Sequence, residues 1–435
     1  MANDFIGTQL GSVGQQIERG ELKAAATLLN ALVKSAPHDP RIYFLAASMA
    51  QQAGNLPACI QSLERALDLA PDWVDAHVAR IRAMSALGEH QLAIDASSEA
   101  LEICGENLAL LEMAAAAADR ADVIEQQEKF LERAAALAPQ RVDILNALAV
   151  CSQRLNHLDN AEKTYLRARN LAPGNVIAIS GMAAVAEMRG DVDAAARDMK
   201  LARQLAPNDP VIAFNLAAAT GEVPATMPAA MVTSLFDDLA PRFDKELVGD
   251  LRYAVPRRFA EIVVERHPDR VLDVLDLGSG TGLVGFYMAP IQGALVGVEL
   301  SRKMIDEAAK HGLYHRFHQV NLLDALAQTP PAQYDVITAA DVFIYVGELT
   351  QAIANAYNVL RPGGMLLFSC ESTTDSEPDL LLRPSNRFAH SERSVRRLCE
   401  AAGFSTITIE SAALRNEGGA PLNGFICRAE RAALS

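Results

Sequence analysis

The hydrophobic pattern changes character near the middle of the chain. Before about residue 220, apolar positions recur three and four residues apart, as in IQSLERALDLAP and AEKTYLRARNLAP, which predicts amphipathic helices. After residue 260, short β-rich runs alternate with helical segments. The chain is therefore expected to contain a helical part followed by an α/β part.

The helical half is an internal repeat with a step of 34 residues, kept by three series of residues. Proline or glycine stands at Pro37, Pro71, Gly105, Pro139, Pro173 and Pro207, alanine at Ala66, Ala100, Ala134, Ala168 and Ala202, and a turn-forming residue at Gly20, Gly54, Gly88, Asp122, Asn156 and Gly190. Glycine, asparagine and aspartate tolerate the backbone of a tight turn, alanine lets two helices approach closely, and proline ends a helix.

A unit of two helices in 34 residues resembles the tetratricopeptide repeat. The resemblance covers about residues 6–220 in six repeats, and it implies a superhelix with a concave groove for a protein or peptide partner. Some such arrays hold a C-terminal carboxylate with Lys and Asn, but the comparable positions here do not make that clamp: Phe44, Val78, Glu112, Asn146 and Ser180. A purely structural or oligomerising stack is the alternative.

The helical period ends in the segment ATGEVPATMPAAMVT at residues 218–232, which contains two prolines and a glycine. A domain boundary is predicted near residue 222. The expected organisation is a repeat domain at residues 1–221 and a second domain at residues 222–435.

The second domain is predicted to be a Rossmann-like α/β fold with a mostly parallel sheet covered on both faces. Strands are expected at residues 271–277, 294–300, 334–340 and 365–370, and helices at residues 282–290, 301–312, 347–360 and 392–403. The last two apolar runs, at residues 404–413 and 423–430, have no helix between them. They are expected to form an antiparallel hairpin at the edge of the sheet.

The first expected strand leads into a glycine-rich turn, Asp276-Leu277-Gly278-Ser279-Gly280-Thr281-Gly282. Gly278 permits the turn, Gly280 leaves room for a ligand beside the backbone, and Gly282 opens the next helix. Glu299 ends the second strand, where a carboxylate can accept hydrogen bonds from both hydroxyls of a ribose.

Two cofactors fit this arrangement. Residues 280–285 match G-x-G-x-x-G, so a nicotinamide dinucleotide must be considered. Against it, the turn begins earlier, at Gly278, and the acid Asp276 would lie near a pyrophosphate. A carboxylate at Asp276 instead favours the zwitterionic methionine end of S-adenosylmethionine.

The whole arrangement resembles the class I S-adenosylmethionine-dependent methyltransferases over about residues 230–430. Four further segments carry the resemblance: residues 321–324 after the third strand, residues 334–341 in the fourth, residues 360–364 before the fifth, and the lid-helix motif at residues 236–244, in which Phe243 replaces the usual Tyr. The resemblance implies S-adenosylmethionine as the cofactor, bound by Asp276, Gly278, Ser279, Gly280, Gly282, Glu299, Leu300, Leu323, Asp324 and Ala340. The two halves together resemble bacterial predicted methyltransferases that carry tetratricopeptide repeats.

Methyl transfer requires a nucleophile held about 3 Å from the methyl group and in line with the bond that breaks, and a base assists if the nucleophile carries a proton. No metal is needed. Asp341, Tyr345 and His390 are candidates because they fall near the carboxyl ends of the expected strands. Each candidate also has a structural alternative. Asp341 could cap a helix, and Tyr345 could line the pocket without reacting. His390 could simply precede Ser391, whose hydroxyl caps the next helix. Tyr253 is expected either over the cofactor or in the core.

Composition narrows the choice of partners. The 435 residues carry a net charge of −15, and both halves are acidic, so neither nucleic acid nor an anionic membrane is an expected partner. The six cysteines are scattered, which predicts reduced, mostly buried thiols, and without a signal peptide or a long apolar run a cytoplasmic location is expected. A local basic cluster suits either an acidic substrate or a solvated helix face: Arg383, Arg387, Arg393, Arg396 and Arg397.

The sequence therefore predicts methyl transfer to a small molecule or a protein, with the repeat domain holding the substrate or a partner. The alternatives are an interaction scaffold with an inactive methyltransferase fold, and a nicotinamide-dependent oxidoreductase. The acceptor and the oligomeric state do not follow from the sequence.

Overall fold

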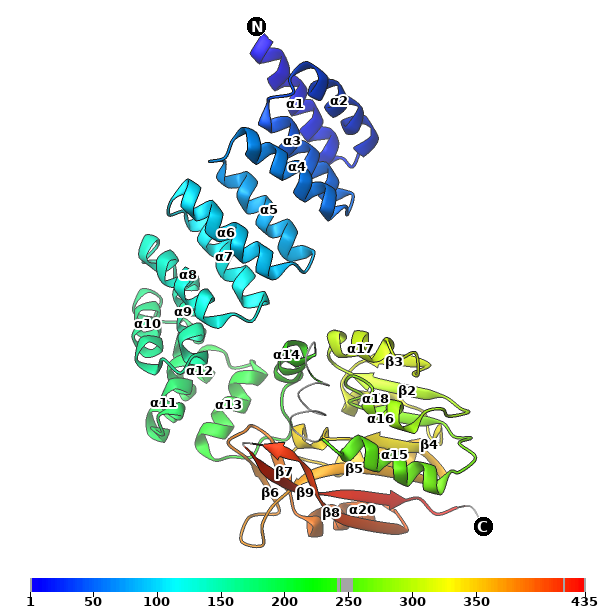
Figure 1. Cartoon of the computed structure of the whole chain (residues 1–435). Helices are drawn as coiled ribbons and strands as arrows, with labels where there is room; N and C mark the ends of the chain where they lie inside the picture. The colour runs from blue at the N-terminus through cyan, green and yellow to red at the C-terminus, as the bar shows by residue number, and fades with distance from the viewer. Residues whose placement is uncertain (1, 241–242, 244–252, 418, 434–435) are drawn as a thin grey trace. The chain divides into compact units, whose positions relative to one another are not determined.

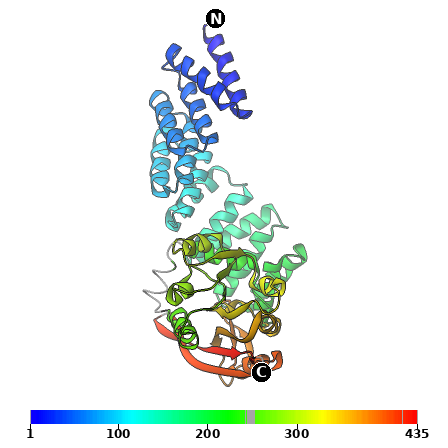
Figure 2. The same ribbon diagram turned by 90° about the vertical axis from the view of Figure 1, so that its right-hand side faces the viewer.

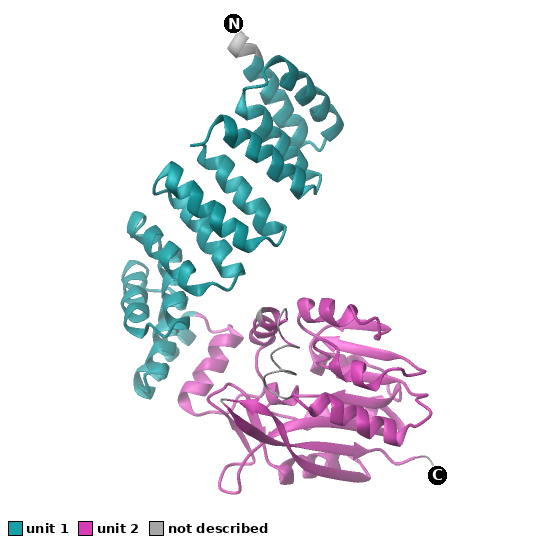
Figure 3. Cartoon of the chain, viewed as in Figure 1, with its two compact units in different colours: residues 1–205 teal, residues 206–435 magenta. Residues whose placement is uncertain are grey.

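The chain divides into two compact units, residues 1–205 and residues 206–435 (Figure 3). A computed structural model describes residues 2–240, 243, 253–417 and 419–433 of the two units, and the statements below concern these residues. The division falls between helix α12 (Val192–Leu205) and helix α13 (Pro210–Thr220). By its contacts α13 thus belongs to the second unit, although the prolines suggested a boundary near residue 222.

The first unit is an α-solenoid of successive helix pairs, as the repeat predicts (Figures 1 and 2). The helices are α1 (Ala2–Glu18), α2 (Leu22–Ser35), α3 (Pro40–Gln52), α4 (Leu56–Leu69), α5 (Val74–Ala86), α6 (His90–Cys104), α7 (Leu108–Arg120), α8 (Ile124–Leu137), α9 (Val142–Arg154), α10 (Leu158–Leu171), α11 (Val176–Met188) and α12. Each helix packs on the one before it and the one after it in the chain.

Each residue series of the repeat has the structural role that its chemistry predicts. All six turn residues, from Gly20 to Gly190, have positive φ angles between 56° and 87°. The five alanines, from Ala66 to Ala202, are completely buried where neighbouring helices meet. The prolines follow the ends of the second helices directly. Local backbone chemistry therefore sets the length of each pair, and small residues set the packing between pairs.

The second unit is built around one mostly parallel sheet, which confirms the predicted α/β class. Its strands are β1 (Val274–Leu277), β2 (Leu295–Glu299), β3 (Arg316–Gln319), β4 (Tyr334–Ala339), β5 (Leu360–Ser372), β6 (Leu380–Leu382), β7 (Phe388–His390), β8 (Thr406–Glu417) and β9 (Ala420–Glu430). The order β3-β2-β1-β4-β5 is parallel throughout. Strand β9 pairs antiparallel with β5 and β8, which forms the expected hairpin at the edge.

Helices cover both faces of this sheet. They are α14 (Ala229–Leu239), α15 (Val255–Arg266), α16 (Leu283–Met288), α17 (Arg302–Ala309), α18 (Leu322–Gln328), α19 (Thr350–Val359) and α20 (Glu392–Ala402), with a short 3₁₀ helix, η2 (Phe343–Tyr345). Leu275 and Leu277 of β1 pack in the core with α18, α19 and α20, whereas Val274 packs with α15 and α16. Alternate residues of a strand point to opposite faces, so both faces of β1 are buried.

The strand order reverses its direction at β1, because the chain moves outward through β2 and β3 and then returns to β4 on the other side of β1. The loops after β1 and β4 consequently diverge at the carboxyl end of the sheet. This is the position at which open α/β sheets bind their ligands.

Helix α13 is integrated into the core of the second unit. Phe214 is 2% exposed and meets Phe388 of β7 edge to face, with ring centroids 6.3 Å apart. The chain that follows is bonded to the loop after η2: the N–H of Met227 donates to the carbonyl of Tyr345 at 3.0 Å, and the N–H of Gly347 donates to the carbonyl of Ala225 at 2.9 Å. Helix α13 and this loop are therefore joined by one small core and a short backbone pairing.

None of the described helices is both long enough and apolar enough to cross a membrane. The six cysteines are all unpaired thiols, five of them buried and Cys104 half-buried.

We expect Phe214→Ala to destabilise the second unit by about 3–5 kcal/mol, because it removes a buried ring and leaves a cavity. Urea denaturation of the full chain, followed by a probe in each unit, measures the effect. Phe286→Ala is the matched control, since Phe286 is 53% exposed and its loss should cost less than about 0.5 kcal/mol. Equal costs for the two substitutions would contradict the assigned role of α13.

Candidate functional site

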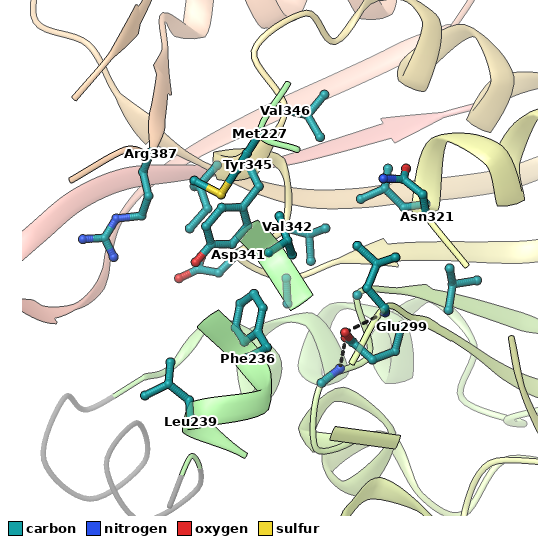
Figure 4. A pocket seen from close by; sticks show the side chains of 18 of the residues that line it. Met227, Phe236, Leu239, Glu299, Asn321, Asp341, Val342, Tyr345, Val346 and Arg387 are labelled. Atoms are coloured by element: carbon teal, nitrogen blue, oxygen red, sulfur yellow. Dashed lines mark hydrogen bonds between the residues drawn. The ribbon is translucent and has the colours of Figure 1, made fainter. Parts of the chain in front are cut away.

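A cavity lies at the carboxyl ends of β1, β2 and β4, in the crevice that the strand order creates (Figure 4). Seven of the sequence-predicted site residues line it: Gly278, Gly280, Glu299, Leu300, Ala340, Asp341 and Tyr345. The other six do not line it: Asp276, Ser279, Gly282, Leu323, Asp324 and His390. Tyr253 lines the cavity and is buried, which fits a core residue, and its expected place over the cofactor stays a prediction.

Positions 278 and 280, after β1, are occupied by glycine for two different physical reasons. A Cβ on Gly278 would lie 2.4 Å from a methyl group of Val342, so this glycine allows the loops after β1 and β4 to touch. Among the described residues, a Cβ on Gly280 would meet only the ring of Phe243, at 3.9 Å, and Gly280 itself lines the cavity. Both have positive φ angles, 62° and 52°. Gly280 therefore has the open approach that a ligand requires.

Glu299 joins the glycine loop to the start of α17. Its Oε2 accepts from the N–H of Gly280 at 3.0 Å, and its Oε1 accepts from the N–H groups of Leu300 and Ser301 at 2.7 and 2.9 Å. Burial raises the pKa of this carboxyl, and the three N–H donors oppose that rise. A carboxylate offers about four lone-pair positions, so the three bonds leave room for a ligand hydroxyl.

Asp276 has different partners from those expected. It is 1% exposed and lies beneath the glycine loop, where its carboxylate accepts from the hydroxyls of Tyr314 at 2.6 Å and Thr338 at 2.7 Å. The oxygen of Tyr314 in turn accepts from the N–H of Gly285 at 3.2 Å. Burial raises the pKa of Asp276 to about 6, against the effect of the two hydroxyl donors. The carboxylate thus supports the loop from below, and its expected contact with the methionine end of the cofactor stays a prediction.

Two other loop residues also serve packing. Gly282 has no room for a side chain, since a Cβ there would lie 3.1 Å from the ring of Tyr314 and 3.2 Å from Ala308. Ser279 is buried, and its N–H donates to the carbonyl of Val298 at 3.0 Å. These contacts fix the loop between β1 and α16 in place.

Beyond β3, the cavity is lined by Asn321 and Leu322. The expected pair Leu323 and Asp324 comes next, in the first turn of α18, and the side chain of Asp324 is exposed. Asn321 caps that helix by accepting from the N–H of Leu323 at 2.8 Å. The sequence motif therefore located the correct loop, but the residues lining the cavity are the first two of its four.

His390 lies on β7, 3% exposed, and its Nε2 donates to the carbonyl of Gly347 at 2.9 Å. Burial lowers the pKa of this imidazole, and its hydrogen bond to Gly347 opposes the shift. With this bond His390 holds the loop that contains Tyr345, and it does not face the cavity. We expected His390 to act in catalysis because it lies near a strand end. In the structure that position lets it support the loop of Tyr345.

The apolar wall of the cavity comes from α14 and the residues around it. The ring of Phe236 meets the ring of Tyr345 edge to face at 5.5 Å and that of Phe243 at 6.1 Å. Asp237 ties this helix to the site, because its Oδ1 accepts from the hydroxyl of Ser301 at 2.5 Å. The expected lid helix is thus present at residues 236–240 and at Phe243, whereas Pro241, Arg242 and Asp244 lie outside the described residues.

The opposite end of the cavity is polar. The carboxylate of Asp341 accepts from the hydroxyl of Ser369 at 2.7 Å and from the guanidinium of Arg415. Arg415 is 6% exposed and also donates to Glu371 at 2.9 Å, which Arg387 contacts at 3.2 Å. Burial raises the pKa of Glu371 and raises that of Tyr345 to about 12. Arg415 was not among the residues predicted from the sequence, because it lies two residues beyond the run expected as an edge strand, 404–413, whereas β8 continues to Glu417.

Every arginine of the basic cluster has a partner. Arg383 pairs with Glu377, Arg387 with Glu371, and Arg393 and Arg397 both pair with Asp379, while Arg396 donates to the carbonyl of Ile407. Arg393, Arg396 and Arg397 of α20 thus fit the alternative of a solvated helix face, whereas Arg387 lines the cavity and is already paired with Glu371.

A second cavity lies within the solenoid, on α9 and the adjacent parts of α7, α8 and α11. Asn146, one of the groove positions named from the sequence, lines it and is 7% exposed. Its Nδ2 donates to Asn175 at 3.3 Å, while its Oδ1 has no hydrogen-bond partner among the described residues. Val150 and Ile177 expose apolar surface at the same place. No group of three or more His, Cys, Asp or Glu in the described part of the chain could hold a metal ion.

Comparison with known proteins finds similarity in the second unit. Residues 275–366, which run from β1 into β5, match the family model described as a methyltransferase domain. This part of the second unit is thus similar to a methyltransferase domain. A curated relative, the ubiquinone biosynthesis O-methyltransferase of Idiomarina loihiensis, is 30% identical over 111 residues, which cover 24% of this chain and 46% of that protein. The chain thus spans less than half the length of such relatives.

Solved structures resemble each part of the chain. The 1,6-didemethyltoxoflavin-N1-methyltransferase of Burkholderia thailandensis, with bound S-adenosylhomocysteine, is 21% identical with a TM-score of 0.38, covering 48% of this chain and 93% of that one. YrrB, described as a TPR protein with an unusual peptide-binding site, is 16% identical with a TM-score of 0.39, covering 44% of this chain and 97% of its own.

We expect Asp276 to make the stability of the methyltransferase unit depend on pH. Its pKa is higher in the folded state than in the unfolded chain, so its contribution is fully present below about pH 4 and is lost as the pH rises through about 6. The difference in unfolding free energy between wild type and Asp276→Asn should therefore fall by about 2 kcal/mol from pH 4 to pH 7.

Urea denaturation at pH 4, 5, 6 and 7 measures this difference. Asp306→Asn, on the exposed side of α17, controls for the loss of one carboxylate. A difference for Asp276→Asn that stays level, or that grows with pH, would show that the carboxylate is not held as described.

Proposed function

We propose that the second unit transfers a methyl group from S-adenosylmethionine to an acceptor bound in the cavity. The main support is that the residues matching a methyltransferase domain, 275–366, are those whose strand ends and loops form the cavity. The cavity also has two chemically different ends, with Glu299 at one and Asp341 and Tyr345 at the other (Figure 4). Such a division suits a cofactor and an acceptor that meet in the middle.

The residues present fit this cofactor. Glu299 retains acceptor capacity for ribose hydroxyls, and the open backbone at Gly280 permits close approach of the methionine part. Asn321 and Leu322 would lie beside the adenine. When bound, S-adenosylmethionine would supply an electrophilic methyl group on a sulfonium, and transfer needs no metal.

The chain's own contribution is position and exclusion of water. Phe236, Phe243 and Leu239 cover the cavity with apolar surface, and Tyr345 and Asp341 face the place where an acceptor would lie. Holding two reactants in line can lower the barrier by roughly 7–11 kcal/mol. A nicotinamide dinucleotide and an inactive scaffold are the alternatives that the sequence left open, and cofactor binding and turnover separate them.

We expect the full chain to bind S-adenosylmethionine but not NAD in calorimetry, and Glu299→Ala to weaken that binding by about 1–3 kcal/mol, because ribose hydroxyls would lose their acceptor. Glu307→Ala in α17 is the matched control, because in the described part of the chain its carboxylate pairs with Lys310 and it does not line the cavity. Binding of NAD in preference, or equal affinity in the two variants, would refute the cofactor assignment.

For the solenoid we propose a protein or peptide partner. Asn146 supports this, because a buried amide oxygen without a partner costs free energy that a partner's backbone N–H would recover. The exposed apolar side chains beside it, Val150 and Ile177, would supply contact area.

A library of random peptides tests this surface. We expect the wild type to bind a subset of peptides and Asn146→Ala to weaken that binding about tenfold, corresponding to one hydrogen bond of about 1.4 kcal/mol. Asn170→Ala, on the exposed side of α10, should leave it unchanged. If no peptide binds, or if both variants behave alike, this surface is not the binding groove.

A further inference from the structure

The polar end of the cavity holds Asp341 in a fixed and unusual conformation. Its φ angle is 52°, which non-glycine residues adopt only at a cost of roughly 1–3 kcal/mol when the surroundings enforce it. Ser369, completely buried, enforces it twice: its oxygen accepts from the N–H of Asp341 at 2.8 Å, and its hydroxyl donates to Oδ1 at 2.7 Å. Arg415 holds the other carboxylate oxygen. A carboxylate this constrained, on the wall of a cavity, is placed in advance for a ligand.

The charges around Asp341 limit what that ligand can be. Two guanidiniums, Arg387 and Arg415, face three carboxylates, those of Asp341, Glu371 and Glu417. Each guanidinium already contacts at least two of the acids, so the cluster has no spare positive charge. An anionic acceptor would bury a further negative charge without a partner, which is costly in an apolar site.

The rest of the acceptor side is mainly apolar, and its one threonine, Thr226, already donates its hydroxyl to the carbonyl of Tyr345 at 3.1 Å. Met227 and Val232 line it from the segment around the start of α14, and Ile344 and Val346 line it from η2 and the residue after it. These four side chains offer no hydrogen bond, so the bulk of an acceptor in contact with them must itself be apolar. The polar group of the acceptor would then lie at the polar end of the cavity, beside Asp341 or Tyr345 (Figure 4).

We propose that the acceptor is an uncharged, mainly apolar small molecule bearing one hydroxyl or amine, and that Asp341 accepts the hydrogen bond from that group. The inference rests on the proposed function. During transfer, a bond forms between the acceptor oxygen or nitrogen and the methyl carbon, and the carbon–sulfur bond breaks with its electron pair remaining on sulfur. The proton of the acceptor passes to the carboxylate of Asp341 and then to water. Ser369 and Arg415 are positioning residues.

The test uses the full chain, methyl-labelled S-adenosylmethionine and the small-molecule fraction of a cell extract. We expect labelled product that passes from neutral water into an organic solvent and keeps its label in mild alkali, as ethers and uncharged N-methyl aromatic amines do. Release of labelled methanol in alkali would reveal a carboxylate ester and overturn the proposal, as would an anionic product. In a parallel sample of whole extract, label confined to macromolecules would also overturn it. Absence of any transfer, although the cofactor binds, would instead refute the proposed function.

Variants assign the role of Asp341. Asp341→Asn should lower the transfer rate at saturating cofactor about 100-fold or more, with cofactor affinity within about twofold of wild type. Ser369→Ala keeps the carboxylate but removes its orientation, and should lower the rate about tenfold without changing the KM for the cofactor. Glu410→Gln, an exposed position on the same strand as Arg415, should match wild type. Unchanged transfer in both Asp341→Asn and Ser369→Ala would overturn the role of Asp341.

Discussion

The site depends on the contact between the loops after β1 and β4, where the backbone of Gly278 lies against the side chain of Val342. The strand order places these loops next to each other and sends their continuations apart. Any side chain at residue 278 would push the loops apart, and Gly280 and Asp341 would then no longer border one cavity. The requirement for glycine at residue 278 is therefore steric, because only glycine readily permits both the positive φ angle and the close approach of the two loops.

A second constraint connects α13 to the same cavity. The edge-to-face contact of Phe214 with Phe388 seats α13 on β7, and the residues after α13 pair with the loop that contains Tyr345. His390, from the same strand as Phe388, bonds to the carbonyl of Gly347 in this loop. The loop is thus held from two sides, by the backbone of the segment after α13 and by His390. A helix at the end of the repeat pattern is in this way part of the support of the acceptor side.

The sequence could predict those features that depend on short-range chemistry. Turn residues with positive φ angles, buried alanines and the alternation of strands and helices are all consequences of local spacing. The glycine loop and Glu299 could be placed because one strand end and the next always meet at the same edge of a parallel sheet. Asp276 was harder, since its position next to the loop does not reveal whether it points at the ligand or, as found, at Tyr314. Tyr314 lies 38 residues further along the chain, and only the packing of β1, β3 and α16 brings them together.

Arg415 could not be predicted from local spacing, because it reaches the site from a distant part of the chain. Glu299 and Gly280 are adjacent to their strand ends in sequence, whereas Arg415 reaches Asp341 from 74 residues away, on an antiparallel strand at a bulge in the β8–β9 pairing. The cofactor side is thus made from local motifs, and the acceptor side from long-range contacts. The long-range contacts also concentrate three carboxylates and two guanidiniums in one buried cluster, which is unfavourable to bury unless every charge is paired. The proposed uncharged acceptor follows from this cluster, because Arg387 and Arg415 already contact its three carboxylates and neither is left over for an anion.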